Sequence, residues 1–102
     1  MPQVEPNIEM QIGTELAQQS VSILNQSSSS IAFYLGENGQ EMTRYLINGG
    51  IFWYSPNYTE DPIIVVYSPS GRVHYKLSKG SSYKIFWDKR ARRWDVREFD
   101  QR

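Results

Sequence analysis

The stretch Ile63-Ile64-Val65-Val66-Tyr67, followed by the turn residues Ser68-Pro69-Ser70-Gly71, decides the fold class of this chain. Five consecutive β-branched or aromatic residues between two prolines are typical of a strand that is buried on both faces. Residues 72–77 and 83–87 then alternate apolar and polar side chains, which predicts two further strands. We therefore expect a three-stranded meander over 62–88, with the rest of the chain packed around it.

Short apolar runs separated by turn residues continue on both sides of this meander. Ile31, Phe33 and Leu35 alternate with smaller or amphipathic residues, which predicts a strand with one apolar face. Asn38-Gly39 is a strong hairpin signal, because both residues tolerate positive φ. Roughly seven to nine short strands are counted in this way, and no connection between them has a helical pattern. The sequence thus predicts an all-β, single-domain antiparallel β-sandwich formed by residues 21–102.

Residues 1–20 are predicted to form an extended N-terminal arm or an edge strand. Their apolar residues Ile8, Met10 and Ile12 alternate with polar ones. The competing interpretation is a short helix over 14–19, which would have only a narrow apolar side. Periodicity favours the arm or edge strand.

Composition excludes several classes of protein. Eleven basic and eleven acidic residues give zero formal net charge, so nucleic acid is not expected as a partner. The chain has no cysteine, which removes disulfides and thiolate metal sites. No apolar run approaches the roughly 18 residues of a membrane span, and residues 1–6 lack the features of a signal peptide. A cytoplasmic protein is the expectation.

The inventory of catalytic side chains is small. His74 is the only histidine, and it lies on the polar face of its predicted strand. Carboxylates occur together at Glu60 and Asp61 and again at Glu37 and Glu41, but neither pair has the spacing of a calcium loop. We therefore predict no catalytic residue, no metal and no cofactor. A small hydrolase that uses Glu60, Asp61 or His74 is kept as an alternative.

Aromatic residues point instead to binding. The chain has three tryptophans, seven tyrosines and four phenylalanines, and Phe52, Trp53 and Tyr54 follow one another without any polar residue. Either both sides of this strand are covered, or one side presents aromatic rings to solvent or to a partner. Together with Tyr58, these residues are predicted to form a partner-binding surface, because tyrosine and tryptophan are enriched at contact sites.

These observations favour a non-catalytic protein-binding module, such as an adaptor, an inhibitor or an assembly subunit. The first alternative is a carbohydrate-binding module in which Trp53, Tyr54 and Tyr58 stack on sugar rings. A homodimer is also predicted as an option, through an edge strand such as 21–24 or 8–12.

A second candidate surface is a basic loop near the C-terminus, which would contact an anionic partner through Lys89, Arg90, Arg92 and Arg93. The competing interpretation is a charged hairpin loop that prevents edge-to-edge pairing of strands, and this interpretation is favoured.

A weak internal repeat links Tyr45–Gly50 with Tyr75–Gly80. Each segment has a tyrosine, an aliphatic residue two positions later and a glycine three positions after that. Two copies are too few for a solenoid or a propeller. The favoured explanation is that two hairpins of one sandwich need similar turns.

Overall fold

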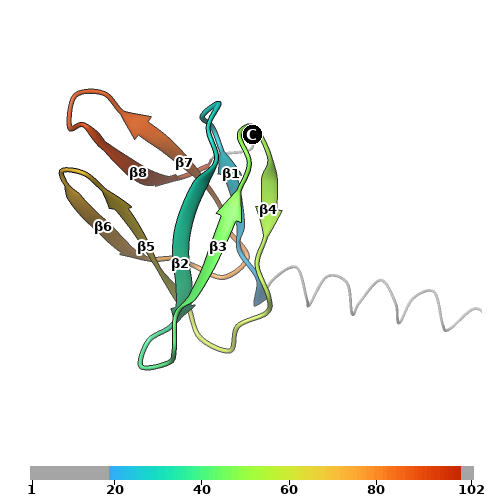
Figure 1. Ribbon diagram of the computed structural model, residues 1–102. Helices are drawn as coiled ribbons and strands as arrows, with labels where there is room; N and C mark the ends of the chain where they lie inside the picture. The colour runs from blue at the N-terminus through green and yellow to red at the C-terminus, as the bar shows by residue number, and fades with distance from the viewer. Residues whose placement is uncertain (1–18, 100–102) are drawn as a thin grey trace, which may run out of the picture.

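Eight strands form two facing four-stranded sheets in the computed structural model, which describes residues 19–99 (Figure 1). One sheet, here called the β1 sheet, has the strand order β4-β1-β7-β8. Its strands are β1 (Ser22–Asn25), β4 (Phe52–Tyr54), β7 (Ser82–Asp88) and β8 (Arg93–Glu98). The other, the β2 sheet, has the order β3-β2-β5-β6. Its strands are β2 (Ile31–Glu37), β3 (Thr43–Ile47), β5 (Pro62–Ser68) and β6 (Gly71–Lys76).

This architecture confirms the predicted all-β, single-domain sandwich. The expected three-stranded meander over 62–88 is wrong, because β5 and β6 form a hairpin in the β2 sheet whereas β7 lies in the β1 sheet between β1 and β8. Neighbouring strands are antiparallel throughout the described residues, except that β1 runs parallel to β7. The predictions made for residues 1–18 lie outside the part of the chain that is described. Among residues 19–99, no helix is long and apolar enough to cross a membrane.

The hydrophobic core lies between the two sheets, where every second side chain of a strand points inward. On β2, Ile31, Phe33 and Leu35 are buried, as their alternation predicted. The facing sheet contributes inward residues of β1 and β7, of which Ile23 and Ile85 are completely buried. The sandwich therefore closes over one apolar layer made by both sheets.

The prediction that β5 is buried on both faces is wrong. Ile64 and Val66 point into the core and are fully buried, whereas Ile63 and Val65 are half-buried and Tyr67 is 55% exposed. No further layer covers the outer face of the β2 sheet within residues 19–99. The run of β-branched residues on that outer face matches the general preference of strands for such side chains.

The Asn38-Gly39 hairpin is present, and its return strand β3 begins at Thr43. Gly39 has the positive φ of 80° that the turn requires, and the Gln40 N–H donates to the Glu37 carbonyl at 3.0 Å. The chain then folds back over Gly36, where an added Cβ would lie 3.0 Å from the Glu41 carbonyl oxygen. Because residues 38–42 occupy this path, β3 pairs with β2 only from Thr43 onward.

Two copies of one three-stranded unit make up most of the sandwich. The β2–β3 hairpin lies in the β2 sheet, and the chain then crosses to the β1 sheet as β4; the β5–β6 hairpin is followed in the same way by β7. The hairpins meet at the antiparallel β2–β5 pair, and β4 and β7 flank β1 from opposite sides. An approximate two-fold axis therefore passes through the centre of β1, where Ile23 pairs with Trp53 on one side and Tyr83 on the other.

The two repeated segments make matching hydrogen bonds to the two ends of segment 20–25, which contains β1. The Gly50 N–H donates to the Asn25 carbonyl at 2.9 Å, and the Gly80 N–H donates to the Ser20 carbonyl at 2.7 Å. Both glycines have positive φ, 75° and 82°, a conformation that glycine adopts without strain. The repeat therefore marks a structural symmetry and not only a similarity of turns.

Strand β8 has no counterpart in this symmetry. It pairs with the outer edge of β7 along its whole length, whereas the chain that leaves β4 returns directly to β5. Within residues 19–99, no strand lies beside the outer edge of β4. The outer edge of β7 is thus covered by β8, whereas the equivalent edge of β4 is uncovered within the described residues.

Candidate functional site

The predicted aromatic surface is divided by the alternation of β4. Phe52 and Tyr54 point away from the core and are 41% and 70% exposed. Trp53 points inward and packs on the core, with its ring centroid 5.2 Å from that of Phe33 and 4.6 Å from that of Tyr45. One side of the strand is therefore covered. On the other side, Tyr54 is open to solvent, and the partly exposed Phe52 ring lies with its centroid 6.0 Å from that of Phe99.

Tyr58 belongs with Trp53 on the inner side. It lies in the loop after β4 and packs against the core beside Tyr45. Burial raises the pKa of the Tyr58 phenol above its usual range, and hydrogen bonding with Tyr45 adds to this rise. Trp53, Tyr54 and Tyr58 consequently do not share one face, so a single sugar-stacking platform made by these three residues is not formed.

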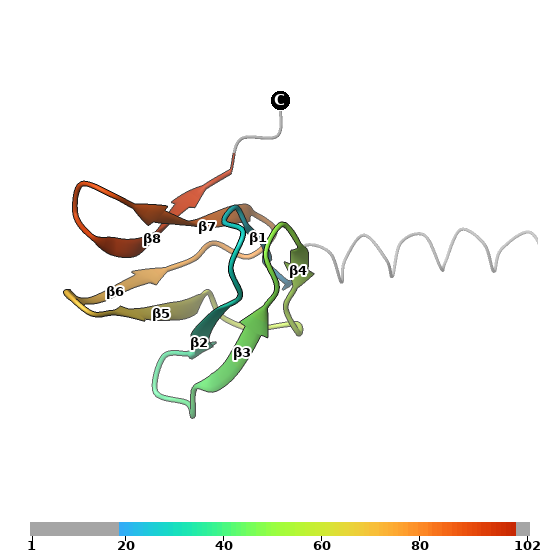
Figure 2. The same cartoon turned by 45° about the horizontal axis from the view of Figure 1, so that its top comes forward.

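Exposed hydrophobic residues gather on the side of the sandwich where β3 and β4 are the end strands. Figures 1 and 2 show β3 and β4 together on this side, while β6 and β8 lie on the opposite side. Leu46 on β3 and Ile51 before β4 are 57% and 52% exposed, and Phe52 and Tyr54 add to them. We call the edges of β3 and β4, with these four residues, the open side. Of these four exposed residues, the sequence analysis named Phe52 and Tyr54 but not Leu46 and Ile51.

Charge distinguishes the open side from the opposite one. The β6 edge carries Arg72, His74 and Lys76, and β8 carries charged residues at most of its positions. β3 has a single charged residue, Arg44, and β4 has none. Charged side chains on an end strand oppose pairing with another chain, so only the open side lacks this protection.

The backbone of β4 directs hydrogen-bonding groups toward the outer edge. Next to β1, the Asn25 N–H donates to the Ile51 carbonyl at 3.0 Å and the Ser55 N–H donates to the Val21 carbonyl at 2.9 Å. In an antiparallel pair, bonded positions alternate along the strand. The N–H and C=O groups of the intervening residue Phe52, and likewise of Tyr54, therefore point away from β1.

The central position of β1 corrects one expectation. Residues 21–24 were predicted as an edge strand available for dimerisation, but β1 lies between β4 and β7 and pairs with both. Both of its edges are used inside the sheet. The other predicted edge strand, 8–12, lies outside the described residues.

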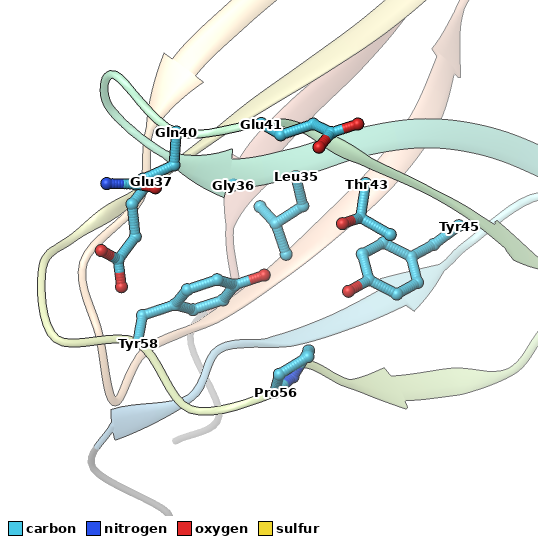
Figure 3. Close-up of a pocket in the computed structure, with 9 residues that line it drawn as sticks. All are labelled: Leu35, Gly36, Glu37, Gln40, Glu41, Thr43, Tyr45, Pro56 and Tyr58. Carbon is cyan, nitrogen blue, oxygen red and sulfur yellow. The ribbon is translucent and has the colours of Figure 1, made fainter.

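A pocket of about 350 Å³ opens at one end of the open side, between β3 and the loop that follows β4 (Figure 3). Its carboxylates come from Glu37 and Glu41, and its hydroxyl groups from Thr43, Tyr45 and Tyr58. The full lining is Leu35, Gly36, Glu37, Gln40, Glu41, Thr43, Tyr45, Pro56 and Tyr58. The lining contains no basic side chain.

The two acidic residues of this pocket differ in how they are held. The Glu37 carboxylate accepts hydrogen bonds from the Thr59 N–H at 2.8 Å and from the Thr59 hydroxyl at 3.2 Å, which fixes its position. Glu41 is exposed on the loop that passes over Gly36. The sequence analysis noted that Glu37 and Glu41 are close together in the chain. The pocket also depends on the close approach of the Glu41 backbone to Gly36, which a single glycine in the sequence does not predict strongly.

The predicted basic loop lies at the opposite end of the sheets from the pocket. Asp88 organises it, because its carboxylate accepts the N–H groups of Arg90 at 3.0 Å and Ala91 at 3.2 Å. Lys89, Arg90 and Arg92 are exposed, while Arg93 is half-buried at the start of β8. Contact of this loop with an anionic partner stays a prediction.

The residues named for a hydrolase are spread over separate places. Asp61 accepts the Lys79 N–H at 3.0 Å, Glu60 is exposed in the preceding loop, and His74 is exposed on β6 opposite Val65. No group of three or more histidine, aspartate or glutamate residues within 19–99 is arranged to hold a metal ion.

Comparisons of the chain with protein-family models, with curated proteins and with solved structures found no match.

Proposed function

We propose that this chain is a non-catalytic protein-binding module that contacts its partner through the open side. The observation that supports the proposal is that the two end strands of this side carry almost no charge and that exposed hydrophobic residues lie along both, with Leu46 on β3 and with Ile51, Phe52 and Tyr54 on or beside β4. Exposed apolar groups of this kind gain free energy when a partner removes them from water. Unprotected strand edges add backbone hydrogen bonds to the same contact.

Capture from native cell extract tests this proposal. The bait is the tagged full chain, compared with a Phe52→Ala, Tyr54→Ala double variant, because both side chains are exposed and their loss leaves the core intact. Tyr67→Ala is the matched control, since Tyr67 is an exposed tyrosine on the outer face of β5. A stoichiometric protein retained by the parent and the control but lost by the double variant supports the proposal. A protein captured equally by all three baits contradicts it.

Carbohydrate binding is a second candidate function, and the pocket is the observation that favours it. Carboxylate, amide and hydroxyl groups next to the Tyr58 ring match the hydroxyl groups and apolar faces of sugars. Trp53 packs on Tyr45, which lines the pocket, so its fluorescence reports on occupancy. A panel of glycans should change the emission of the parent but not of a Tyr58→Ala variant confirmed to be folded; an unchanged parent spectrum excludes this candidate.

A further inference from the structure

The uncovered outer edge of β4 has a known counterpart inside the same molecule. The approximate two-fold axis relates β4 to β7, and β8 occupies the outer edge of β7, antiparallel to it. The matching position beside β4 holds no strand within residues 19–99. The symmetry of the fold thus indicates which element this edge accepts, namely a strand that runs antiparallel to β4.

We propose that the outer edge of β4 pairs with β4 of a second copy of this chain, so that the two β1 sheets join into one continuous sheet. The inference rests on the proposed function, because it names the partner for the same open side. Two copies related by a two-fold axis place their β4 strands antiparallel, which is the direction that β8 adopts beside β7.

The backbone of β4 fits this pairing in register. The outward-directed groups belong to Phe52 and Tyr54, as the hydrogen bonds of the flanking residues with β1 indicate. An axis through Trp53 therefore brings Phe52 opposite Tyr54 of the second copy, with exchange of N–H···O=C bonds at both pairs. On the outer face these are aromatic cross-strand pairs, which are among the favourable ones.

Charge selects the β4 edge over the β6 edge for contact between identical copies. Residues 51–54 carry no charge, so an identical strand meets no electrostatic repulsion there. An equivalent pairing of two β6 strands about His74 would set Arg72 opposite Lys76 of the other copy, and like charges directly opposite destabilise a sheet. The side chains of β4 are thus self-complementary, whereas those of β6 repel a copy of themselves.

The short length of β4 determines the expected strength. Three residues give a contact smaller than the roughly 1,200 Å² or more that specific interfaces usually bury. The dimer should therefore form at high protein concentration and dissociate on dilution. Sedimentation equilibrium of the full chain over a roughly hundredfold concentration range should show the mass rise from that of one chain toward that of two.

Three variants assign the dimer to this edge. Phe52→Pro removes an outward N–H and should hold the protein at the mass of one chain, whereas His74→Pro, the same change at the outer edge of β6, should leave dimerisation unchanged. Because a proline can impair folding, Tyr54→Lys provides an independent test: it places a charge on the contact at a side chain that is 70% exposed, and it should also abolish the dimer.

The outcomes separate this inference from the proposed function. A parent protein that stays at the mass of one chain at every concentration overturns the inference, and so does a dimer that persists in folded Phe52→Pro and in Tyr54→Lys. If a monomeric parent nevertheless captures a different protein through Phe52 and Tyr54, the protein-binding function holds and only the second copy is excluded as partner. A concentration-dependent dimer that both variants abolish supports the inference.

Discussion

Replacement of Asn25 by alanine should destabilise the protein by about 3 kcal/mol. Asn25 is completely buried at the end of β1, where its amide donates to the carbonyls of Ser29 at 2.7 Å and Ile47 at 3.0 Å. Its Oδ1 accepts the N–H of Ser27 at 3.0 Å and the hydroxyl of Ser27 at 2.8 Å. The predicted loss reflects these four hydrogen bonds, which contribute about 0.5 to 1.5 kcal/mol each, while the carbonyl of Ile47 keeps its β-ladder partner Ile31.

Urea denaturation followed by tryptophan fluorescence measures this loss. With the usual dependence of unfolding free energy on urea, the midpoint should fall by about 1 to 3 M. Asn48→Ala is the control, because it removes one exposed hydrogen bond, from the Ser30 hydroxyl to Asn48 Oδ1 at 3.0 Å, and should change stability by less than about 1 kcal/mol. If Asn25→Ala loses no more stability than this control, the buried amide does not hold the strand ends together.

Further predictions concern the core, the turns and pH. Trp53→Ala should destabilise by about 3 kcal/mol and Tyr54→Ala by less than about 0.5 kcal/mol; equal losses in urea denaturation would contradict their opposite orientations. Gly49→Ala should destabilise more than Gly50→Ala, although only Gly50 has positive φ, because a Cβ on Gly49 would lie 2.6 Å from the Ser28 carbonyl carbon; the reverse order of melting temperatures would contradict this packing. The free energy of unfolding should fall as pH rises above about 10, because burial raises the folded-state pKa of Tyr58 and the unfolded chain releases that proton first. Tyr58→Phe should lessen this slope, and an unchanged slope would contradict the assignment.

Alternation of side chains carried the successful part of the prediction. On β2, large apolar residues at Ile31, Phe33 and Leu35 are separated by single residues, and a strand places such positions on one face whatever its neighbours are. The fold class follows from several such runs with turn residues between them. The same logic fails at β5, where Ile63 and Val65 have the residue types of a core although they lie on the outer face.

Strand order was beyond the reach of the sequence because the pairings are distant along the chain. β1 pairs with β4 and with β7, and nothing within 21–24 indicates either neighbour. A short apolar run has the same pattern in an internal strand and in an edge strand. Residues 21–24 were therefore expected at an edge, although β1 lies inside its sheet between β4 and β7. The division of Phe52 and Trp53 between two sides follows from alternation, but which side is covered depends on these pairings.

The two symmetric units share one strand, β1, on their inner side. Gly50 bonds to Asn25 at the end of β1, and Gly80 bonds to Ser20 just before β1 begins. A strand that is antiparallel to β4 has to be parallel to β7, since those two strands are antiparallel to each other. β1 therefore pairs with the inner edges of both β4 and β7, but it is antiparallel to β4 and parallel to β7. On the outer side, β8 protects β7 with charged residues, while β4 keeps an uncharged edge with Tyr54 exposed. The site at which the internal symmetry is broken is thus the site with the backbone groups and apolar side chains that a further strand would use.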